Sequence, residues 1–488
     1  MKNKEQETET RNEKPIMPEE QQSVTQHKIT INGQTLNYTV TAGTMLLKEE
    51  DVEEGEKPKA AVFYVAYTLI RESQEVPRPV TFSFNGGPGS SSVWMHLGLL
   101  GPKRVLMQDD GKPFPPPYQL VDNEYTLLKE TDLVFIDPVS TGYSRAVPKE
   151  KPEQFHNYQK DIESVGEFIR LWTTRNNRWS SAKFLIGESY GTTRAGGLAE
   201  YLHERYGMYL NGIMLVSSIL NFMTARFTPG NDLPYLLFLP TYTATAWYHQ
   251  KLSKDLQADL RKTLDEVEKF VNTEYTLALM QGNRLSATER TKIIKKLARY
   301  TGLSEDYIDR SNLRIEIFRF TKELLRDQNE TVGRLDSRYK GFDRDSAGEN
   351  FENDPAYNAI LGTYTATFYD YVRRDLKFEM DRTYEILSNL FETWKYDTYQ
   401  NQFVNTAEKL RIAFQYNPSL NVIVCNGYFD LATPYFATEY TINHIELPKA
   451  QTEQIRMTYY EAGHMMYVHL PSLAQVSADL ATFVKESL

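Results

Sequence analysis

Short apolar runs recur along the chain and alternate with segments whose apolar residues have helical spacing. The runs lie in PVTFSFNGG, DLVFIDPVSTG, KFLIGES, GIMLVSS, NVIVCNGYFD and IRMTYYEAGH. Near-continuous apolar runs of this length are typical of strands that a parallel sheet buries on both faces. DIESVGEFIRLW, between two of these runs, has the apolar spacing of a helix. This order predicts an α/β fold with a mostly parallel central sheet and helices on both faces.

The N-terminal part of the chain has a different pattern. HKITINGQTLNYTVTAGTMLL alternates polar and apolar residues around Asn32-Gly33, which predicts a hairpin, and KAAVFYVAYTLI predicts another strand. Residues 1–26 are mostly polar and contain no apolar stretch of the kind found in signal peptides. We therefore expect residues 1–26 to be a disordered tail.

Residues 228–384 replace the strand pattern with helical spacing. Ser286 and Glu289 form a capping-box pattern at the start of one helix. We predict a core made of residues 27–227 and 385–488, into which residues 228–384 are inserted as a helical cap. Another apolar helical face in this insertion is formed by Leu252, Leu256, Leu260, Leu264, Val267 and Val271.

Composition narrows the classes of function. The 488 residues are 41% hydrophobic and 12% aromatic, which allows a large core. The net charge of −10 argues against a nucleic-acid partner, and no apolar run approaches the roughly 18 residues that span a bilayer. The single cysteine, Cys425, excludes an intrachain disulfide and lies in an apolar run, as a buried structural thiol would. We expect a cytoplasmic protein without nucleic-acid or membrane partners.

The sequence GESYG places Ser189 between two glycines, directly after a predicted strand and before a predicted helix. G-x-S-x-G in this context predicts a sharp turn that exposes a nucleophilic serine above the sheet. Such a serine needs a histidine base, which a carboxylate orients. Asp430 and His464 each follow a later predicted strand, so the parallel sheet brings all three to one edge. His444 and His469 are further histidines downstream, and His469 is expected to be structural.

An acyl-transfer site also needs backbone N–H donors for the oxyanion. Tyr190, directly after the serine, supplies one, and the glycine-rich loop FSFNGGPGSSS is the candidate for the other. The alternatives for this loop are a plain tight turn or a phosphate-binding loop, although no lysine follows it. Glu461-x-x-His464 resembles half of a di-iron motif, but no second copy and no H-E-x-x-H motif are present. We expect no metal and no cofactor.

NGGPGSSS, GESYG, GYFDLATP and EAGHMMY, together with GPKRV and IDPVSTGYS, resemble the serine carboxypeptidases, the S10 peptidase family. The motifs occur in the family's order over most of the chain. The resemblance implies an α/β-hydrolase fold with a helical cap and the release of C-terminal residues from peptides. The resemblance gives Ser189 the role of the nucleophile, His464 that of the base and Asp430 that of the partner of the base.

The resemblance also implies roles for the residues around the serine. The N–H groups of Gly87 and Tyr190 form the oxyanion hole, while Asn85, Gly86 and Glu188 bind the terminal carboxylate of a peptide substrate. A carboxyl group binds a carboxylate by a hydrogen bond only if one of the two is protonated. We therefore predict that peptidase activity falls as the pH rises. The alternative is that Glu188 hydrogen-bonds only its own loop.

Three positions depart from the family pattern. Ser83 replaces a tryptophan, Ser90 a cysteine that normally forms a disulfide, and Leu99 a second glutamate of the carboxylate site. An esterase or acyltransferase on the same scaffold is therefore a second hypothesis, because it uses the same acyl-enzyme. A non-catalytic binding protein with this fold is a third, and the intact serine, aspartate and histidine argue against it. The oligomeric state is not predicted.

Overall fold

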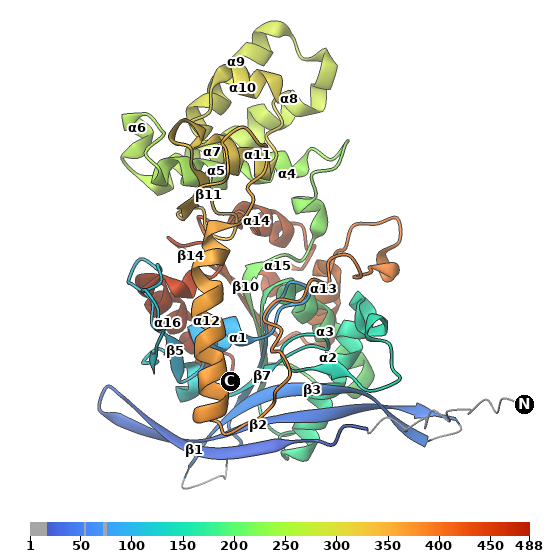
Figure 1. Ribbon diagram of the computed structural model, residues 1–488. Coiled ribbons are helices and arrows are strands. Elements are labelled where there is room, and N and C mark those ends of the chain that lie inside the picture. The colour runs from blue at the N-terminus through green and yellow to red at the C-terminus, as the bar shows by residue number, and fades with distance from the viewer. Residues whose placement is uncertain (1–16, 53–54, 72–75) are drawn as a thin grey trace, which may run out of the picture.

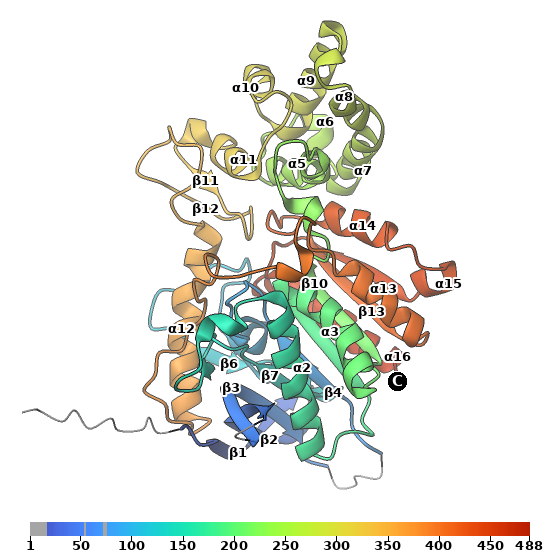
Figure 2. The same cartoon turned by 90° about the vertical axis from the view of Figure 1, so that its right-hand side faces the viewer.

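The computed structural model describes residues 17–52, 55–71 and 76–488. A mostly parallel sheet lies at its centre, with the strand order β1-β2-β3-β7-β4-β9-β10-β13-β14 (Figures 1 and 2). The predicted α/β architecture is thereby confirmed. The six parallel strands are β7 (Asp132–Ile136), β4 (Val80–Phe84), β9 (Lys183–Ser189), β10 (Gly212–Ser218), β13 (Asn421–Gly427) and β14 (Ile455–Tyr460).

The N-terminal strands extend this sheet in the antiparallel direction. β1 (Gln22–Ile31) and β2 (Gln34–Asp51) form the predicted hairpin around Asn32-Gly33, and β3 (Gly55–Leu69) joins them to β7. Residues 1–16 of the predicted tail lie outside the described residues. The prediction that the tail extends to residue 26 is wrong, because Gln22 to Gln26 pair with Gly43 to Thr39 of β2. These residues are polar because little of this edge strand is buried.

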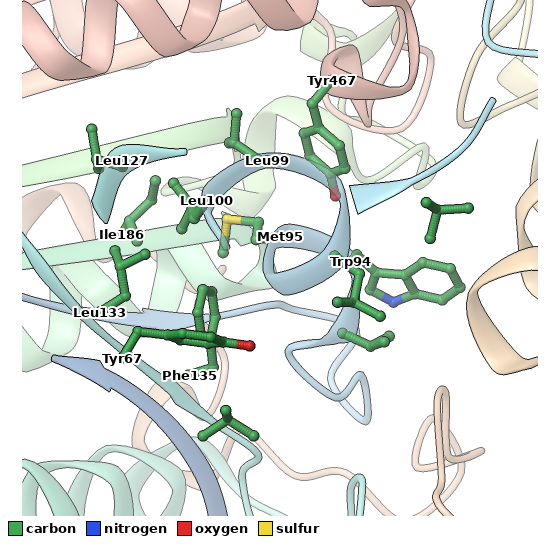
Figure 3. Close-up of a cluster of buried hydrophobic side chains, with 14 of the residues drawn as sticks. Tyr67, Trp94, Met95, Leu99, Leu100, Leu127, Leu133, Phe135, Ile186 and Tyr467 are labelled. Carbon is green, nitrogen blue, oxygen red and sulfur yellow. The ribbon is translucent and has the colours of Figure 1, made fainter. Parts of the chain in front are cut away.

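Helices cover both faces of the sheet. Leu185 and Ile186, adjacent on β9, enter two different hydrophobic clusters, because successive side chains of a strand point to opposite faces. Figure 3 shows part of the cluster that contains Ile186. The helices against the Leu185 face are α2 (Tyr158–Arg175), α3 (Tyr190–Tyr206) and α13 (Ala407–Tyr416). Those against the Ile186 face are α1 (Val93–Met95), α12 (Pro355–Arg374) and α16 (Leu470–Glu486).

A third hydrophobic cluster lies beyond the carboxyl ends of the parallel strands, at the top of Figures 1 and 2. Asp259 caps α7 by accepting a hydrogen bond from Lys262 N, so the expected apolar face is broken between α6 and α7. Leu252 precedes α6, and Val271 begins a π-helical turn after α7. The capping box of Ser286 and Glu289 is present in α9. The helices here are α4 (Leu233–Leu237), α5 (Leu239–Tyr248), α6 (Lys254–Gln257), α7 (Leu260–Phe270), α8 (Thr276–Gln281), α9 (Ala287–Thr301), α10 (Glu305–Arg310) and α11 (Ile317–Glu323).

Two elements connect this region to the core. The short hairpin of β11 (Thr331–Val332) and β12 (Lys340–Gly341) brings the chain back to the sheet edge. α12 then runs alongside the sheet, and its apolar residues belong to the Ile186 cluster rather than to the cap (Figure 2). Among the described residues, no helix is long and apolar enough to cross a membrane. The remaining elements are β5 (Lys103–Val105), β6 (Leu120–Asp122), β8 (Arg145–Ala146), α14 (Tyr435–Asn443) and α15 (Lys449–Thr452).

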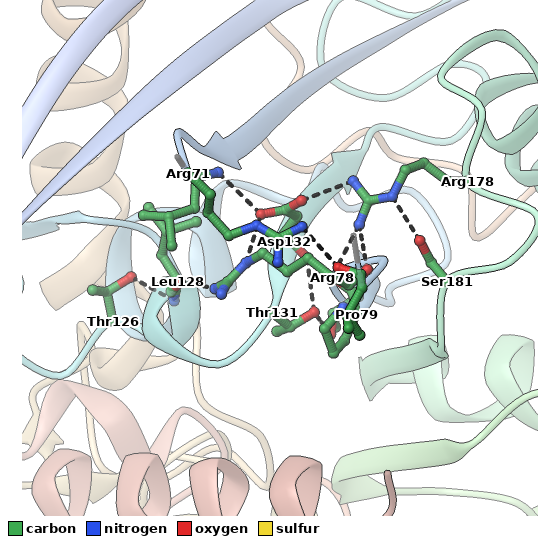
Figure 4. A network of polar contacts seen from close by, with 12 residues as sticks. Arg71, Arg78, Pro79, Thr126, Leu128, Thr131, Asp132, Arg178 and Ser181 are labelled. Atoms are coloured by element: carbon green, nitrogen blue, oxygen red, sulfur yellow. Dashed lines mark hydrogen bonds and ion pairs between the residues drawn. The ribbon is translucent and has the colours of Figure 1, made fainter. Parts of the chain in front are cut away.

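A buried charge network joins the strands at their amino ends (Figure 4). Asp132, the first residue of β7, accepts hydrogen bonds from Arg78 Nε at 2.9 Å, Arg178 Nη1 at 2.7 Å and Leu69 N at 3.0 Å. Arg178 also donates to the carbonyl of Arg78 at 2.6 Å. Both oxygens of this carboxylate are therefore paired, and the segments before β4 and β9 are fixed to β7.

Candidate active site

Ser189 lies at the junction of β9 and α3, in a conformation that only a constrained turn maintains. Its φ of 60° and ψ of −130° are rare for a residue with a side chain, and such strain is concentrated at functional sites. A Cβ at Gly187 would overlap the Gly191 carbonyl, and one at Gly191 would lie 2.7 Å from Phe84 O. The two glycines are thus required by the close approach of strand, turn and helix. Ser189 remains partly exposed, whereas its two neighbours are buried.

Asp430 and His464 form a buried pair at the same edge of the sheet. His464 Nδ1 lies 2.8 Å from Asp430 Oδ2, which orients the imidazole. The backbone N–H groups of Ala432 and Thr433 donate to Asp430 Oδ1 at 2.8 and 3.0 Å, and the Thr433 hydroxyl donates to Oδ2 at 2.7 Å. Burial lowers the pKa of His464, but the charge and hydrogen bond of Asp430 outweigh burial and raise it above its ordinary value.

β10 connects this pair to the serine. Ser217 donates its hydroxyl to the carbonyl of His464 at 2.6 Å, and the next residue, Ser218, pairs with Ser189 across the two parallel strands. The structure therefore brings Ser189, Asp430 and His464 to the same edge of the sheet. Within the described residues the Ser189 hydroxyl makes no hydrogen bond of its own, and catalytic hydrogen bonds are often completed only when substrate binds.

The β11–β12 turn of the insertion holds the loops of both Asp430 and His464. Its Arg334 carbonyl accepts from Leu431 N at 3.1 Å, and its Leu335 carbonyl accepts from His464 N at 2.6 Å. The loop that follows Asp430 and the loop that carries His464 are thus fixed to two adjacent residues of this turn. The insertion is therefore part of the framework of the site and more than a cover over it.

Asp336 adds a side-chain contact to this framework. Its carboxylate accepts from Gly463 N at 3.1 Å, and Arg338 donates to the same carboxylate at 2.7 Å. Arg338 also donates to the carbonyl of Glu461 at 3.1 Å. Asp336 is buried and lies directly against the glycine that precedes His464, where a Cβ would overlap it. This contact fixes the backbone from which the imidazole of His464 projects.

The glycine-rich loop after β4 lies against the serine turn. A Cβ at Gly86 would overlap Tyr190 N, so the loop backbone is in contact with the first residue of α3. N–H groups at a helix start have no intrahelical acceptor and favour negative charge, as an oxyanion hole requires. Buried Arg194 donates to the Asn85 carbonyl at 2.6 Å and pairs with Asp161 at 2.9 Å. This ion pair positions the loop that holds Gly87.

Glu188, directly before Ser189, is buried among polar side chains. Tyr467 donates its hydroxyl to Glu188 Oε2 at 2.6 Å, so the partner of Glu188 lies across the site and not in its own loop. Burial raises the pKa of Glu188 to about 7, against the lowering effects of His464, Tyr467 and Asn85. Asn85 Nδ2 is buried close enough to Glu188 to lower the pKa of its carboxyl group, but within the described residues no acceptor lies in hydrogen-bonding geometry to it. Both groups are suited to receive a carboxylate.

The positions that depart from the family pattern are apolar or weakly polar in the structure. Leu99 is buried in the hydrophobic cluster of Figure 3, beside Met95 and Leu100. Ser90 accepts a hydrogen bond from Trp94 Nε1 at 2.8 Å, and Ser83 is buried in β4. Of the two glutamates that the resemblance implies, only Glu188 is present, and the buried Leu99 stands at the other position.

The alternative histidines and metal sites lie elsewhere or are absent. His469 Nδ1 bonds the Ser472 hydroxyl at 2.8 Å, and His444 Nδ1 bonds the Tyr440 carbonyl at 2.7 Å. In the part of the chain that the structure describes, no group of three histidine, cysteine or acidic side chains could hold a metal ion. Cys425 is buried and free, and burial raises its pKa to about 12, as for an inert thiol.

Several residues of the site are not found by sequence reasoning. Tyr467 and Thr433 lie within the motifs EAGHMMY and GYFDLATP, so their positions carry a signal, although no role was assigned to them. Ser217 and Asp336 carry no such signal. Gly463 and Asp336 are 127 residues apart, and only the folded insertion brings them together.

Known proteins resemble this chain in sequence and in fold. The family model for serine carboxypeptidases matches residues 47–479. Among curated proteins, the chain is 34% identical over 126 residues to the pheromone-processing carboxypeptidase KEX1 of Saccharomyces cerevisiae, covering 25% of this chain and 16% of that protein. It is 27% identical over 157 residues to serine carboxypeptidase-like 33 of Arabidopsis thaliana, covering 30% of this chain and 29% of that protein.

A solved structure shows the same fold. The crystal structure of a Saccharomyces cerevisiae KEX1 prohormone-processing carboxypeptidase covers 92% of this chain and 91% of its own, with a TM-score of 0.55 and 16% identity. The sequence alignments span well under two thirds of the length of the curated relatives. The family model, however, covers most of the chain. The fold is that of the α/β-hydrolases, and the chain belongs to the serine carboxypeptidase family.

Proposed function

We propose that this protein is a serine carboxypeptidase that releases C-terminal residues from peptides through an acyl-enzyme on Ser189. The Ser189 hydroxyl attacks the scissile carbonyl while His464 Nε2 takes its proton, and Asp430 stabilises the resulting imidazolium. The N–H groups of Gly87 and Tyr190 hold the oxyanion. The carbon–nitrogen bond then breaks as His464 returns the proton to the leaving amine. Water, activated by His464, hydrolyses the ester and frees Ser189.

The observation that supports a carboxypeptidase over other hydrolases is the environment of Glu188. A buried carboxyl group whose pKa is raised to about 7 is largely protonated under acidic conditions. It can then donate a hydrogen bond to a substrate carboxylate, while the unpaired Asn85 Nδ2 donates a second. Esters and internal peptide bonds offer no such carboxylate. The pair therefore selects a free C-terminus.

The test uses one short peptide and its C-terminally amidated form, incubated from about pH 5 to about pH 8 with analysis by mass spectrometry. We expect single residues to be released from the free acid only, and Ser189→Ala to be the inactive control. Equal cleavage of both peptides, or no cleavage of either, would contradict the proposal.

One observation supports a second candidate, an esterase or acyltransferase. Leu99 is buried and apolar at the position where the resemblance implies a further carboxyl group, so carboxylate binding rests on fewer groups. If the peptides are not cleaved, simple esters with and without competing alcohols should be turned over by Ser189. Products that contain the added alcohol would identify acyl transfer.

A further inference from the structure

Arg334 is a cation without a counter-ion beside the catalytic pair. Its backbone carbonyl bonds the loop of Asp430, and the next residue bonds His464 N. Its side chain is only partly exposed, and burial lowers its pKa. Over residues 17–52, 55–71 and 76–488, no hydrogen-bond acceptor or carboxylate lies within bonding distance of its guanidinium. Arg334 is thus half-buried, without a partner within the described residues, and its guanidinium nitrogens remain accessible to a ligand.

The carboxylates near Arg334 are already engaged. Asp430 is paired with His464 at 2.8 Å. Asp354 accepts the backbone N–H groups of Leu335 and Ala356, each at 3.0 Å, and Glu316 accepts from Phe318 N at 2.8 Å. These acids raise the pKa of Arg334 only through space. The guanidinium therefore keeps its five donors free for a ligand.

A second arginine, Arg226, lies near Arg334, and its guanidinium has no hydrogen bond or ion pair within the described residues. Arg226 is exposed, and its guanidinium carbon lies 5.2 Å from the ring centroid of Phe222. Phe222 packs in one small cluster with Tyr190, the residue after the nucleophile. Arg226 lowers the pKa of Arg334, so the two like charges are close enough to disfavour each other. An anion between them would remove this repulsion.

The strand order places Arg226 on one side of the nucleophile, and Arg334 lies on the same side because its turn bonds the loops after β13 and β14, which follow β10 in the sheet. β9, which ends in Ser189, lies between β4 and β10. Asn85 follows β4, on the side proposed to hold the terminal carboxylate and the leaving residue. Arg226 follows β10, on the opposite side. The two arginines therefore lie on the side of Ser189 that would hold the acyl half of a bound substrate.

We propose that Arg334 and Arg226 bind an acidic side chain in the acyl half of the substrate, so that the enzyme prefers glutamate or aspartate directly before the C-terminal residue. This inference rests on the proposed function, because it takes the substrate to be a peptide. The contacts of Arg334 and Arg226 involve only the acyl half of that substrate. A bidentate arginine bond to a carboxylate is short and directional, and an uncharged amide of the same shape cannot replace it.

The experiment compares N-blocked Glu-Phe with N-blocked Gln-Phe at about pH 6, where an ordinary glutamate side chain is ionised. We expect kcat/KM to favour the glutamate peptide by about tenfold or more. Arg334→Gln and Arg226→Gln should each reduce this ratio severalfold, and the double variant should bring it to about one. Arg310→Gln, an exposed cap arginine paired with Asp306, is the matched control and should keep the wild-type ratio.

Two further measurements separate this inference from the proposed function. The α-ethyl esters of N-blocked glutamate and glutamine share the acyl half but need no carboxylate recognition, so they report the preference even if neither peptide is cleaved. Binding of the two peptides to Ser189→Ala needs no turnover. A Glu/Gln ratio near one in all these assays would overturn the inference, as would equal losses on both substrates in both arginine variants, since that result identifies a structural counter-charge. If the esters show the glutamate preference but neither peptide is cleaved, only the proposed carboxypeptidase activity would be overturned.

Discussion

Buried charges are fully paired at the amino end of the central sheet and incompletely paired at its carboxyl end. At the amino end, Asp132 is bonded by Arg78, Arg178 and a backbone N–H group, and both of its oxygens are paired. At the carboxyl end, Glu188 has one tyrosine donor and a pKa raised by burial to about 7, while Arg334 has no counter-ion in the part of the chain that is described.

This difference distinguishes charges that stabilise the fold from charges that are left available for a ligand. A buried charge costs free energy unless it is paired and hydrogen-bonded, so the amino end contributes to folding only because its network is complete. At the carboxyl end the unpaired donors and the strained Ser189 destabilise the folded state. Substrate groups can complete these contacts, so we assign the incomplete end to function.

The largest expected effect is that of Ser189→Ala. Removing the nucleophile should lower kcat/KM by about 10⁴-fold or more, because the remaining groups then act without it. Ser189→Gly should be equally inactive. Its free energy of unfolding should exceed that of Ser189→Ala by about 1 kcal/mol, because glycine adopts a φ of 60° without strain. Turnover and thermal unfolding of the two variants test this. Retained activity in Ser189→Ala would mean that another residue is the nucleophile.

Asp132→Asn, at the amino end of the sheet, should lower the stability of the fold and not the activity of the folded protein. It leaves two largely buried arginines without a carboxylate, which typically costs about 3–5 kcal/mol of unfolding free energy. Asp381→Asn, which removes an almost fully exposed partner of Arg373, is the control and should change stability by less than about 0.5 kcal/mol.

Chemical denaturation measures both variants, and kcat/KM is measured well below the unfolding temperature. The comparison of the two ends fails if Asp132→Asn is as stable as the wild type, or if its folded form loses activity as Ser189→Ala does.

Asp336→Asn should have an intermediate effect, because it loosens the support of His464 without removing a reacting group. We expect kcat to fall by about 10- to 100-fold, as for a displacement of a catalytic group by about 1 Å, while KM changes little. Asp343→Asn breaks a buried ion pair with Lys322 elsewhere in the insertion and is the matched control. A similar fall in kcat in both variants would show that the insertion acts through its overall stability and not through the Gly463 contact.

The elements found from sequence are those that local pattern determines. The buried strands, the serine turn and the capping box of Ser286 depend on residues close together in the chain, and the structure has all of them. Gln22 to Gln26 were missed because an edge strand with little burial has the same polar composition as a tail.

The parts of the site that could not be predicted depend on contacts between distant segments. Asp430 and His464 could be proposed because each follows a strand, and parallel strands end at the same edge. Asp336 and Arg334 lie in an irregular turn of the insertion, and nothing near them in sequence indicates that the turn reaches the catalytic loops. Their roles follow from hydrogen bonds across about a hundred residues or more of chain, such as that from Gly463 to Asp336.

The smallest expected effect, on pH dependence, sharpens the comparison most. In the wild type, KM for a free-acid peptide should rise as the pH passes about 7, because Glu188 then loses the proton that it donates to the substrate carboxylate. Glu188→Gln cannot ionise, so its KM should be nearly independent of pH. Tyr467→Phe removes a hydrogen bond that favours the ionised form of Glu188, so its KM should begin to rise at a higher pH than in the wild type.

Initial rates of a peptide and of a simple ester, measured across this pH range, separate the two titrations. The ester should show only the acid limb of His464, which must be neutral to accept the serine proton and whose pKa is raised by Asp430. If KM for the peptide does not depend on pH in the wild type, or rises equally in Glu188→Gln, the proton on Glu188 does not bind substrate. The incomplete charge at this end of the sheet would then need an explanation other than carboxylate recognition.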